Sequence, residues 1–177
     1  MKYKHILLGI TGGIAAYKAP LIVRLLKSKG ADVRCVMTRN ATNFVTPLTL
    51  QTVSQNKVYI EPFEVAGVWN PEHIALADWA DLFLIAPATA NCIGKYAAGI
   101  ADDLLTTTLL AYTGPVLLAP TMNDKMYANP IVQRNIKTLK EFGIKFIDPT
   151  IGELACGSTG KGRMPDPEEI VSYIETL

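Results

Sequence analysis

The chain has 177 residues, of which 49% are hydrophobic and 19% are charged, and its formal net charge is +1. This composition is typical of a globular protein, and the length allows one domain with a sizeable core. The near-neutral charge argues against a protein that binds nucleic acid or an acidic membrane surface, and no stretch approaches the ~20 apolar residues of a membrane span.

Four continuous apolar runs predict strands that are buried on both faces, which is typical of a parallel sheet. Each run stops at small, hydroxyl or amide residues. In chain order the runs are 5–10, 33–37, 82–86 and 116–119. Because ligands of open parallel sheets bind beyond the carboxyl ends of the strands, we expect the functional site at these four strand ends.

Helical patterns alternate with these strands. The expected helices lie between Gly13 and Gly30, near 47–53, from Pro71, after the strand that ends near 88, from Asp102 or Asp103, from Pro130 to 141 or 142, and over 168–176. A last strand is expected over 145–148, a loop or isolated turn over 122–128, and a glycine-rich loop over 149–167. The alternation predicts a single α/β domain over residues 1–177, three-layered and Rossmann-like, with a doubly wound, mainly parallel sheet.

The cysteines are odd in number and widely spaced, at Cys35, Cys92 and Cys156. Such a set favours free thiols in a reducing cytoplasm over a disulfide framework. No two potential ligands among the histidines and cysteines have the spacing of a zinc site, so we expect no metal.

Residues 9–14 join the first predicted strand to a helix and include Gly12 and Gly13. Small residues here let backbone amides approach a phosphate, and the helix dipole favours its negative charge. The pattern lacks both the full dinucleotide fingerprint and the lysine of a P-loop. It predicts a phosphate-bearing ligand, and the alternative is a tight turn that needs glycine but binds nothing.

Three residues are candidates for chemistry, and each has a structural alternative. His73 carries an imidazole, which suits proton transfer near neutral pH, but it could equally be a surface or capping residue of its helix. Asn123 could bind a carboxylate beside a flat apolar ring, or it could cap a helix. Cys156 lies in the glycine-rich segment near Lys161 and Arg163, where a thiol could be activated or could be incidental.

Taken together, five linked segments resemble the flavin-containing cysteine decarboxylases. They follow the order of that family over nearly the whole chain, at residues 9–14, 73–74, 87–91, 120–126, and 155–157 with 162–164. Two departures are visible. Tyr127 stands where the family usually has Trp, and Thr89 and Cys92 replace the commoner Ser and Thr. We expect these departures to affect the fit of the substrate rather than the chemistry.

The resemblance implies bound FMN and a homotrimer, or a homododecamer of four trimers, with the flavin near subunit boundaries. It implies His73 as the active-site base, Asn123 as a ligand of the substrate carboxylate and Cys156 as a proton donor. The flavin contacts that it implies are Gly12, Gly13, Thr38, Phe44, Thr89, Asn91 and Met122.

The implied reaction is the FMN-dependent decarboxylation of 4'-phosphopantothenoylcysteine to 4'-phosphopantetheine in coenzyme A biosynthesis. Loss of CO2 from a cysteinyl carboxylate leaves charge on a carbon that has no electron sink. Oxidation of the side-chain thiol to a thioaldehyde by FMN creates that sink, and reduced FMN with an acid later converts the enethiolate to the saturated thiol. Bifunctional relatives continue into a ligase domain, whereas this chain ends after its closing helix, so we expect the decarboxylase alone.

Three other functions are compatible with parts of the pattern. A peptidyl-cysteine decarboxylase would share the flavin step but stop at the enethiol, and a flavin prenyltransferase would not need His73 together with Cys156. A flavin-binding regulatory subunit that inhibits a phosphatase would tend to carry an acidic tail or to lose a catalytic residue. We also expect residues 149–163 to close over the substrate as a lid, with glycines absorbing the change in backbone angles.

Overall fold

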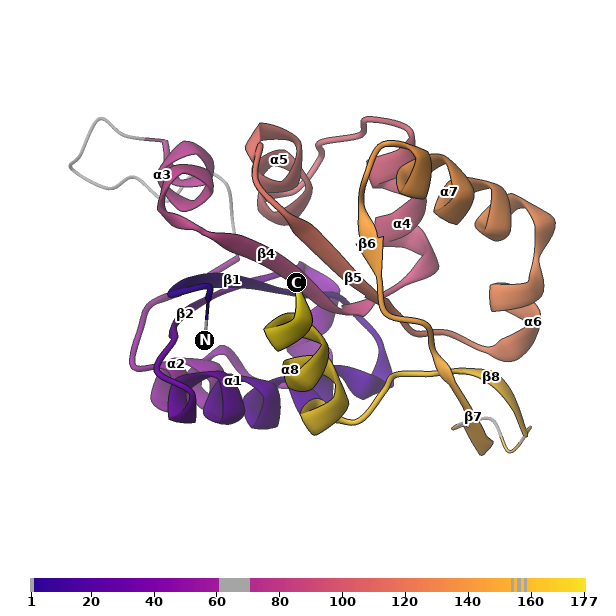
Figure 1. Ribbon diagram of the computed structural model, residues 1–177, viewed down its shortest axis with the longest axis horizontal. Helices are drawn as coiled ribbons and strands as arrows, with labels where there is room; N and C mark the ends of the chain where they lie inside the picture. Colours follow the sequence, from indigo (N-terminus) through magenta and orange to yellow (C-terminus); the bar gives the residue numbers. More distant parts are fainter. Residues whose placement is uncertain (1, 61–70, 154, 156, 158) are drawn as a thin grey trace.

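The computed structural model describes residues 2–60, 71–153, 155, 157 and 159–177. Within this part of the chain, six strands form one parallel sheet with the order β3-β2-β1-β4-β5-β6 (Figure 1). Their bounds are β1 His5–Ile10, β2 Asp32–Met37, β3 Val58–Tyr59, β4 Leu82–Ala88, β5 Val116–Pro120 and β6 Lys145–Phe146. The predicted α/β fold with a doubly wound parallel sheet is therefore confirmed.

The strand order reverses at the centre of the sheet. Strand β1 pairs in parallel with β2 on one side, where Ile6 lies opposite Val33, and with β4 on the other, where Ile6 lies opposite Leu82. The chain winds outward from this point in both directions, so the loops after β1 and β4 leave the sheet toward opposite faces. A crevice between such loops is where open parallel sheets bind their ligands.

Helices cover both faces of the sheet and complete three layers. Helices α1, α2 and α8 pack on one face, and α3, α4, α5 and α7 on the other (Figure 1). Their bounds are α1 Ala19–Ser28, α2 Pro47–Ser54, α3 Glu72–Trp79, α4 Ala90–Ala97, α5 Leu104–Ala111, α6 Asp124–Ala128, α7 Pro130–Glu141 and α8 Pro167–Thr176. Two short 3-10 helices, η1 Ile14–Lys18 and η2 Arg39–Asn43, follow β1 and β2.

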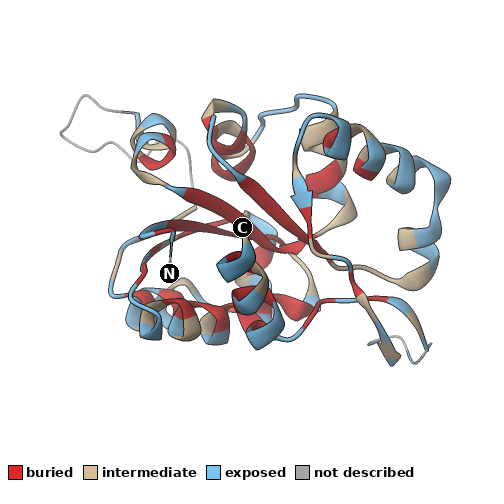
Figure 2. Ribbon diagram, in the orientation of Figure 1, coloured by how far each residue is buried: buried red, intermediate tan, exposed pale blue. Residues whose placement is uncertain are grey.

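Alternation along each strand explains why the apolar runs are continuous. On β1, Ile6 and Leu8 point to the face that carries α1, whereas Leu7 points to the face that carries α5. All three are fully buried, and the central strands are buried along their length (Figure 2). A strand with helices on both faces has no solvent side, so no polar residue interrupts its pattern.

Several helix ends follow from local sequence. Thr89 caps α4, Asp103 caps α5 through a capping box with Thr106, and Asn129 caps α7 with Pro130 in its first turn. The expectation of an isolated turn within 122–128 is confirmed, because α6 is a five-residue helix. None of the helices in the described ranges is long and apolar enough to cross a membrane.

The prediction of a loop over 149–167 was wrong. Two antiparallel strands, β7 Thr150–Glu153 and β8 Thr159–Arg163, form a hairpin there, and α8 begins at Pro167. The glycines of β8 hid this hairpin in the sequence, because glycine is rare in strand interiors and signals a loop. The short strand β3 and the two 3-10 helices were also not predicted.

We expect truncation of a core leucine on β4 to be far more destabilising than the same change on the surface. Leu84 is fully buried, whereas Leu48 on α2 is 71% exposed. The Leu84→Ala variant should lose about 2–5 kcal/mol of the free energy of unfolding, and Leu48→Ala at most about 0.5 kcal/mol. Urea denaturation measures both, and equal losses would contradict the assignment of β4 to the centre of the core.

Candidate functional site

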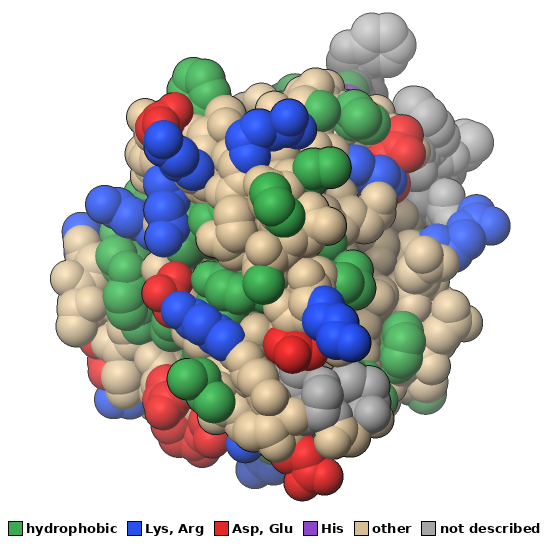
Figure 3. All heavy atoms as spheres, turned by 90° about the vertical axis from the view of Figure 1, so that its right-hand side faces the viewer, with side chains coloured by type: hydrophobic (Ala, Val, Ile, Leu, Met, Phe, Trp, Pro, Cys, Tyr) green, Lys and Arg blue, Asp and Glu red, His purple; other side chains and the backbone are tan. Residues whose placement is uncertain are grey.

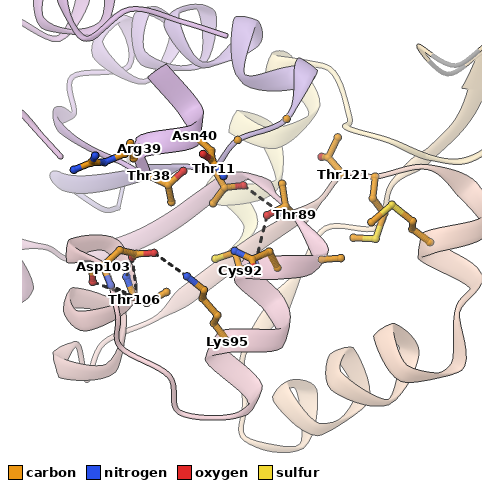
Figure 4. A pocket seen from close by; sticks show the side chains of 16 residues that line it. Thr11, Thr38, Arg39, Asn40, Thr89, Cys92, Lys95, Asp103, Thr106 and Thr121 are labelled. Atoms are coloured by element: carbon orange, nitrogen blue, oxygen red, sulfur yellow. Dashed lines mark hydrogen bonds and ion pairs between the residues drawn. The ribbon is translucent and has the colours of Figure 1, made fainter. Parts of the chain in front are cut away.

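A cavity of about 600 Å³ opens at the carboxyl ends of β1, β2 and β4, where the strand order reverses. Sixteen residues from five segments of the chain line it, and Figure 4 shows their side chains. They are Thr11, Gly12, Gly13, Thr38, Arg39, Asn40, Thr89, Ala90, Asn91, Cys92, Lys95, Asp103, Thr106, Thr121, Met122 and Met126. We call this space the first cavity.

Thr11 joins the two strand ends that border the first cavity. Its side chain is buried, and its Oγ1 donates to the carbonyl of Pro87 at 2.7 Å while accepting from the backbone N–H of Thr89 at 3.1 Å. Thr89 Oγ1 in turn accepts from the N–H of Cys92 at 3.4 Å and so caps α4 (Figure 4). The turn after β1 and the start of α4 are therefore held together by one hydroxyl.

The glycine turn beside Thr11 is packed against η2. A Cβ on Gly12 would lie 2.5 Å from Cβ of Asn40, which no side chain tolerates, whereas one on Gly13 would have ordinary room at 3.5 Å from Thr89. Glycine is therefore needed at position 12 for the close approach of two backbone segments. This close approach brings the loop after β2 to the same edge as the loop after β1.

Thr38 carries a buried hydroxyl group that lacks a hydrogen-bond partner in the described structure. Its Oγ1 is buried and has no hydrogen-bond partner among the described residues, although the residue lines the first cavity. A buried hydroxyl without a partner costs roughly 1–3 kcal/mol, so such groups in native structures commonly await a ligand or water. The first turn of α4, at Ala90 and Asn91, faces the same space and adds the partial positive charge of a helix N-terminus.

A compact ionic cluster forms the wall on the side of α4 and α5. Lys95 Nζ lies 2.6 Å from Oδ1 of Asp102 and 3.3 Å from Oδ2 of Asp103. Hydrogen bonding to Asp102 raises the pKa of Lys95, so the ammonium is charged at neutral pH. Cys92 lies beside the cluster, and burial raises the pKa of its thiol to about 12, which keeps it neutral and poorly nucleophilic.

A second cavity of about 350 Å³ adjoins the first and shares Gly13, Thr121 and Met122 with it. It is lined further by Ile14, Ala15, Tyr17, Lys18, Asn123, Glu153, Ala155, Gly162, Arg163 and Met164. Asn123 thus lies beside residues that belong to both spaces. Its Oδ1 also accepts from the N–H of Lys125 at 2.9 Å, so the capping role considered from the sequence is real, although the helix that it caps is only the single turn α6.

The hairpin formed by β7 and β8 packs directly on the turn that carries Asn123. The N–H of Met122 donates to the carbonyl of Gly162 at 3.1 Å. A Cβ on Gly162 would overlap the carbonyl oxygen of Met122, and one on Gly160 would lie 2.5 Å from Cβ of Asp124. The glycines of β8 therefore permit a backbone-to-backbone contact that fixes the Met122–Asn123 turn.

Most of the expected flavin contacts meet at one place. Gly12, Gly13, Thr38, Thr89, Asn91 and Met122 all line the first cavity. Phe44 lines neither cavity and is 43% exposed on the surface. Asn123 lines the second cavity, whereas the half-buried His73 on α3 lines neither. Cys156 lies outside the described residues.

Sequence reasoning missed the charged wall of the first cavity. Asp103 was expected only as a possible helix start, and Lys95 and Thr106 were not singled out. The available signal was helical spacing, because Lys95 follows Cys92 by three residues and so shares a face of α4 with it.

Among the described residues, no group of three or more His, Cys, Asp and Glu side chains could hold a metal ion. On the face that carries α6 and the hairpin, described basic and acidic side chains are interspersed with hydrophobic ones (Figure 3).

Comparison with known proteins identifies clear relatives. Residues 1–177 match the protein family described as Flavoprotein. The chain is 52% identical over 172 residues to the coenzyme A biosynthesis bifunctional protein CoaBC of Bacillus subtilis (strain 168), covering 97% of this chain but only 42% of that relative. The chain thus spans less than half the length of this curated relative.

Two solved structures have the same fold over almost their full length. A PPC decarboxylase variant, with a cysteine exchanged for serine and pantothenoylaminoethenethiol bound, superimposes with a TM-score of 0.87 at 33% identity, covering 99% of this chain and 98% of that one. The FMN-dependent cysteine decarboxylase SpaF superimposes with a TM-score of 0.83 at 33% identity, covering 96% and 94% of the two chains.

We expect Gly162→Ala to loosen the turn that carries Asn123, because the added methyl group would displace the carbonyl of Met122. Hydrogen–deuterium exchange of peptides that contain Met122 should accelerate roughly tenfold, as expected when one backbone hydrogen bond is lost. Gly152→Ala in the same hairpin is the matched control, since its Cβ would meet only the flexible side chain of Arg163 at 3.4 Å. Unchanged exchange in Gly162→Ala would show that the hairpin does not hold the turn.

Proposed function

The chain belongs to the flavoprotein family, and from this premise we propose that it decarboxylates 4'-phosphopantothenoylcysteine to 4'-phosphopantetheine with FMN as cofactor, a step of coenzyme A biosynthesis. The observation that carries the proposal is the pair of adjoining cavities at the reversal of strand order. The first has hydroxyl, amide and glycine residues suited to a phosphate-bearing cofactor, and the second extends past Asn123 as a site for an elongated substrate. The similarity to CoaBC and to a PPC decarboxylase supports this assignment.

The residues of the first cavity fit FMN. The unpartnered Oγ1 of Thr38, the glycine turn at Gly12 and the N-terminus of α4 offer hydrogen-bond donors and partial positive charge to a phosphate. A volume of about 600 Å³ lies within the range of cofactor sites. Met122 and Met126 offer the apolar surface that a flat ring needs.

FMN, when bound, supplies a two-electron oxidant for the substrate thiol and returns the same electrons after CO2 has left. The chain's own residues then have three roles. Asn123 orients the substrate carboxylate from the boundary between the two cavities, His73 accepts the proton of the thiol as it is oxidised to the thioaldehyde, and Cys156 donates the proton that completes the saturated product. The balance closes over the whole reaction. The electron pair removed from the substrate thiol would be restored to the enethiolate, His73 would return its proton to the product thiolate, and the proton from Cys156 would take the place of the CO2 that has left.

The absence of His73 from the lining of both cavities supports a site that is completed by a second copy of the chain. Within one chain His73 lines neither cavity, whereas Asn123 lines the second. Ile14 and Tyr17 line that same cavity and are each 56% exposed, so they offer apolar surface beside it that a second copy would cover. We therefore assign a homo-oligomer, either a homotrimer or a homododecamer of four trimers, with His73 reaching the cavities of a neighbour.

We further assign residues 1–177 to one catalytic domain that works in the cytoplasm. One continuous sheet with helices on both faces supports the single domain. The free, buried thiols of Cys35 and Cys92 are compatible with a reducing compartment. A small molecule is the substrate, and neither nucleic acid nor a membrane takes part.

Peptidyl-cysteine decarboxylation is the second candidate, since the same flavin step serves both reactions and the peptidyl-cysteine decarboxylase EpiD has the same fold, with a TM-score of 0.81 at 26% identity. The two candidates differ in the last step. A peptide-tail enzyme releases the enethiol, whereas an enzyme of coenzyme A biosynthesis must reduce it. The identity of 52% to CoaBC favours the second outcome for this chain.

Purified protein incubated with 4'-phosphopantothenoylcysteine should release CO2 and form 4'-phosphopantetheine. Cys156→Ser should still release CO2 but should accumulate the enethiol, with saturated product reduced at least roughly 100-fold because a positioned acid is lost. Mass spectrometry separates the two products by two hydrogen atoms. Cys35→Ala is the control, since this thiol is buried in β2 away from both cavities. Normal yield of saturated product from Cys156→Ser would refute the role of that thiol.

A mixing experiment tests whether two copies build one site. His73→Asn and Asn123→Ala should each be inactive alone, but differently tagged copies expressed together should form mixed oligomers. If neighbouring copies contribute the two residues, about a quarter of the sites regain both, and activity returns to that level. Mixed oligomers that are purified through both tags yet remain inactive would overturn the shared site.

A further inference from the structure

We propose that Lys95 binds the pyrimidine edge of the flavin ring and stabilises its reduced form, so that the α4–α5 wall sets the reduction potential of the cofactor. This inference rests on the binding of FMN in the first cavity. It adds a residue, a contact and an orientation of the cofactor that neither the resemblance nor the comparisons assign.

One N–H donor of Lys95 has no acceptor among the described residues. An ammonium group carries three N–H donors. Two of them are used by Asp102 at 2.6 Å and Asp103 at 3.3 Å, and the described residues offer the third no acceptor. The side chain is only 20% exposed and lines the first cavity, where Figure 4 shows it on the same wall as Asp103 and Thr106. A ligand in the cavity is therefore the natural acceptor.

The α4–α5 wall is held rigidly by hydrogen bonds at the start of α5. Asp103 Oδ1 accepts from both the N–H and the Oγ1–H of Thr106 at 2.8 Å, and the N–H of Asp103 donates to Thr106 Oγ1 at 3.3 Å, which completes the capping box of α5. The carboxylate that holds Lys95 is thus fixed by a helix end rather than by a flexible loop. A positive charge held in this way is preorganised, so it costs little reorganisation when charge develops on the ligand.

The charges of the α4–α5 wall favour the ring of the cofactor over its phosphate. Asp103 is the one acidic residue among those that line the first cavity, and Asp102 adds a second carboxylate behind Lys95. One ammonium and two carboxylates leave a negative sum, which disfavours a dianionic phosphate. The side of Thr38 and the glycine turn has no carboxylate among its lining residues and provides an unpartnered hydroxyl. The phosphate therefore belongs to that side, and the ring extends toward Lys95.

The pyrimidine edge of the flavin ring becomes more negative when the ring is reduced. The pyrimidine edge of an oxidised flavin presents carbonyl oxygens that accept a hydrogen bond. Addition of two electrons and one proton leaves a negative charge on that edge, and a nearby cation stabilises it. An N–H of Lys95 would interact with both forms but more strongly with the reduced one. Lys95 thus opposes the two carboxylates of the wall and favours removal of electrons from the substrate thiol, which is the demanding step of the proposed reaction.

The test compares the reduction potential of FMN bound to four variants with that of the unmodified protein. Lys95→Met should lower the potential by about 30 mV, equal to a tenfold loss of preference for reduced over oxidised FMN. Lys95→Arg, which keeps the charge, should retain the potential. Asp102→Asn removes a neutralising carboxylate and should raise the potential. Lys4→Met removes the same charge before β1, at the opposite edge of the sheet, and should change nothing.

The opposite signs expected for Lys95→Met and Asp102→Asn separate the proposal from a merely structural role, because both variants break the same ion pair. Dye-equilibration spectroscopy measures the potential, and fluorescence titration measures the affinity for oxidised FMN. An unchanged potential in Lys95→Met with FMN bound, or shifts of equal sign in both variants, would overturn the role of Lys95. If the unmodified protein takes up no FMN at all, the cofactor assignment itself fails, which is a different result.

Discussion

The parallel pairing of β1 with β4 is the constraint on which the rest of this structure depends. It places two strand ends side by side at the centre of the sheet, and the buried hydroxyl of Thr11 links them by contacting Pro87 and Thr89. Because this hydroxyl both donates and accepts, it holds the glycine turn and the cap of α4 at a set separation. The crevice between them is thereby built into the fold rather than formed by flexible loops.

The polar and charged groups that line the first cavity differ between its two sides. One side has the glycine turn, a helix N-terminus and the unpartnered hydroxyl of Thr38, whereas the other has Lys95 held by two carboxylates. A ligand with an anionic end and a neutral, electron-accepting end matches this division. In the proposed reaction, Lys95 on this second side would favour electron uptake by the flavin.

The second cavity shows how distant segments complete a site. The hairpin of β7 and β8 reaches the turn at Met122 through glycines that allow direct backbone contact, and it thereby supports Asn123. The proposed base, His73, lines neither cavity within one chain. A division of chemistry between neighbouring copies would couple activity to assembly, because a lone chain would hold cofactor and substrate without the group that begins the reaction.

The resemblance to a known family supplied the six expected flavin contacts that line the first cavity, but the sequence by itself determined the layers of this fold and the edge at which this cavity lies. It could do so because strands covered on both faces leave continuous apolar runs, and because parallel strands bring their polar ends to one edge. Only the tertiary structure decided the hairpin, the charged wall and the exclusion of Phe44 and His73 from the cavities. These features depend on contacts between different elements of the fold. Strand β8 needs glycine to approach Met122, and Lys95 becomes part of a charged cluster only because it lies beside Asp103. Local patterns carry no information about such contacts, since the same glycines and charges are equally typical of a loop and of a solvated helix face.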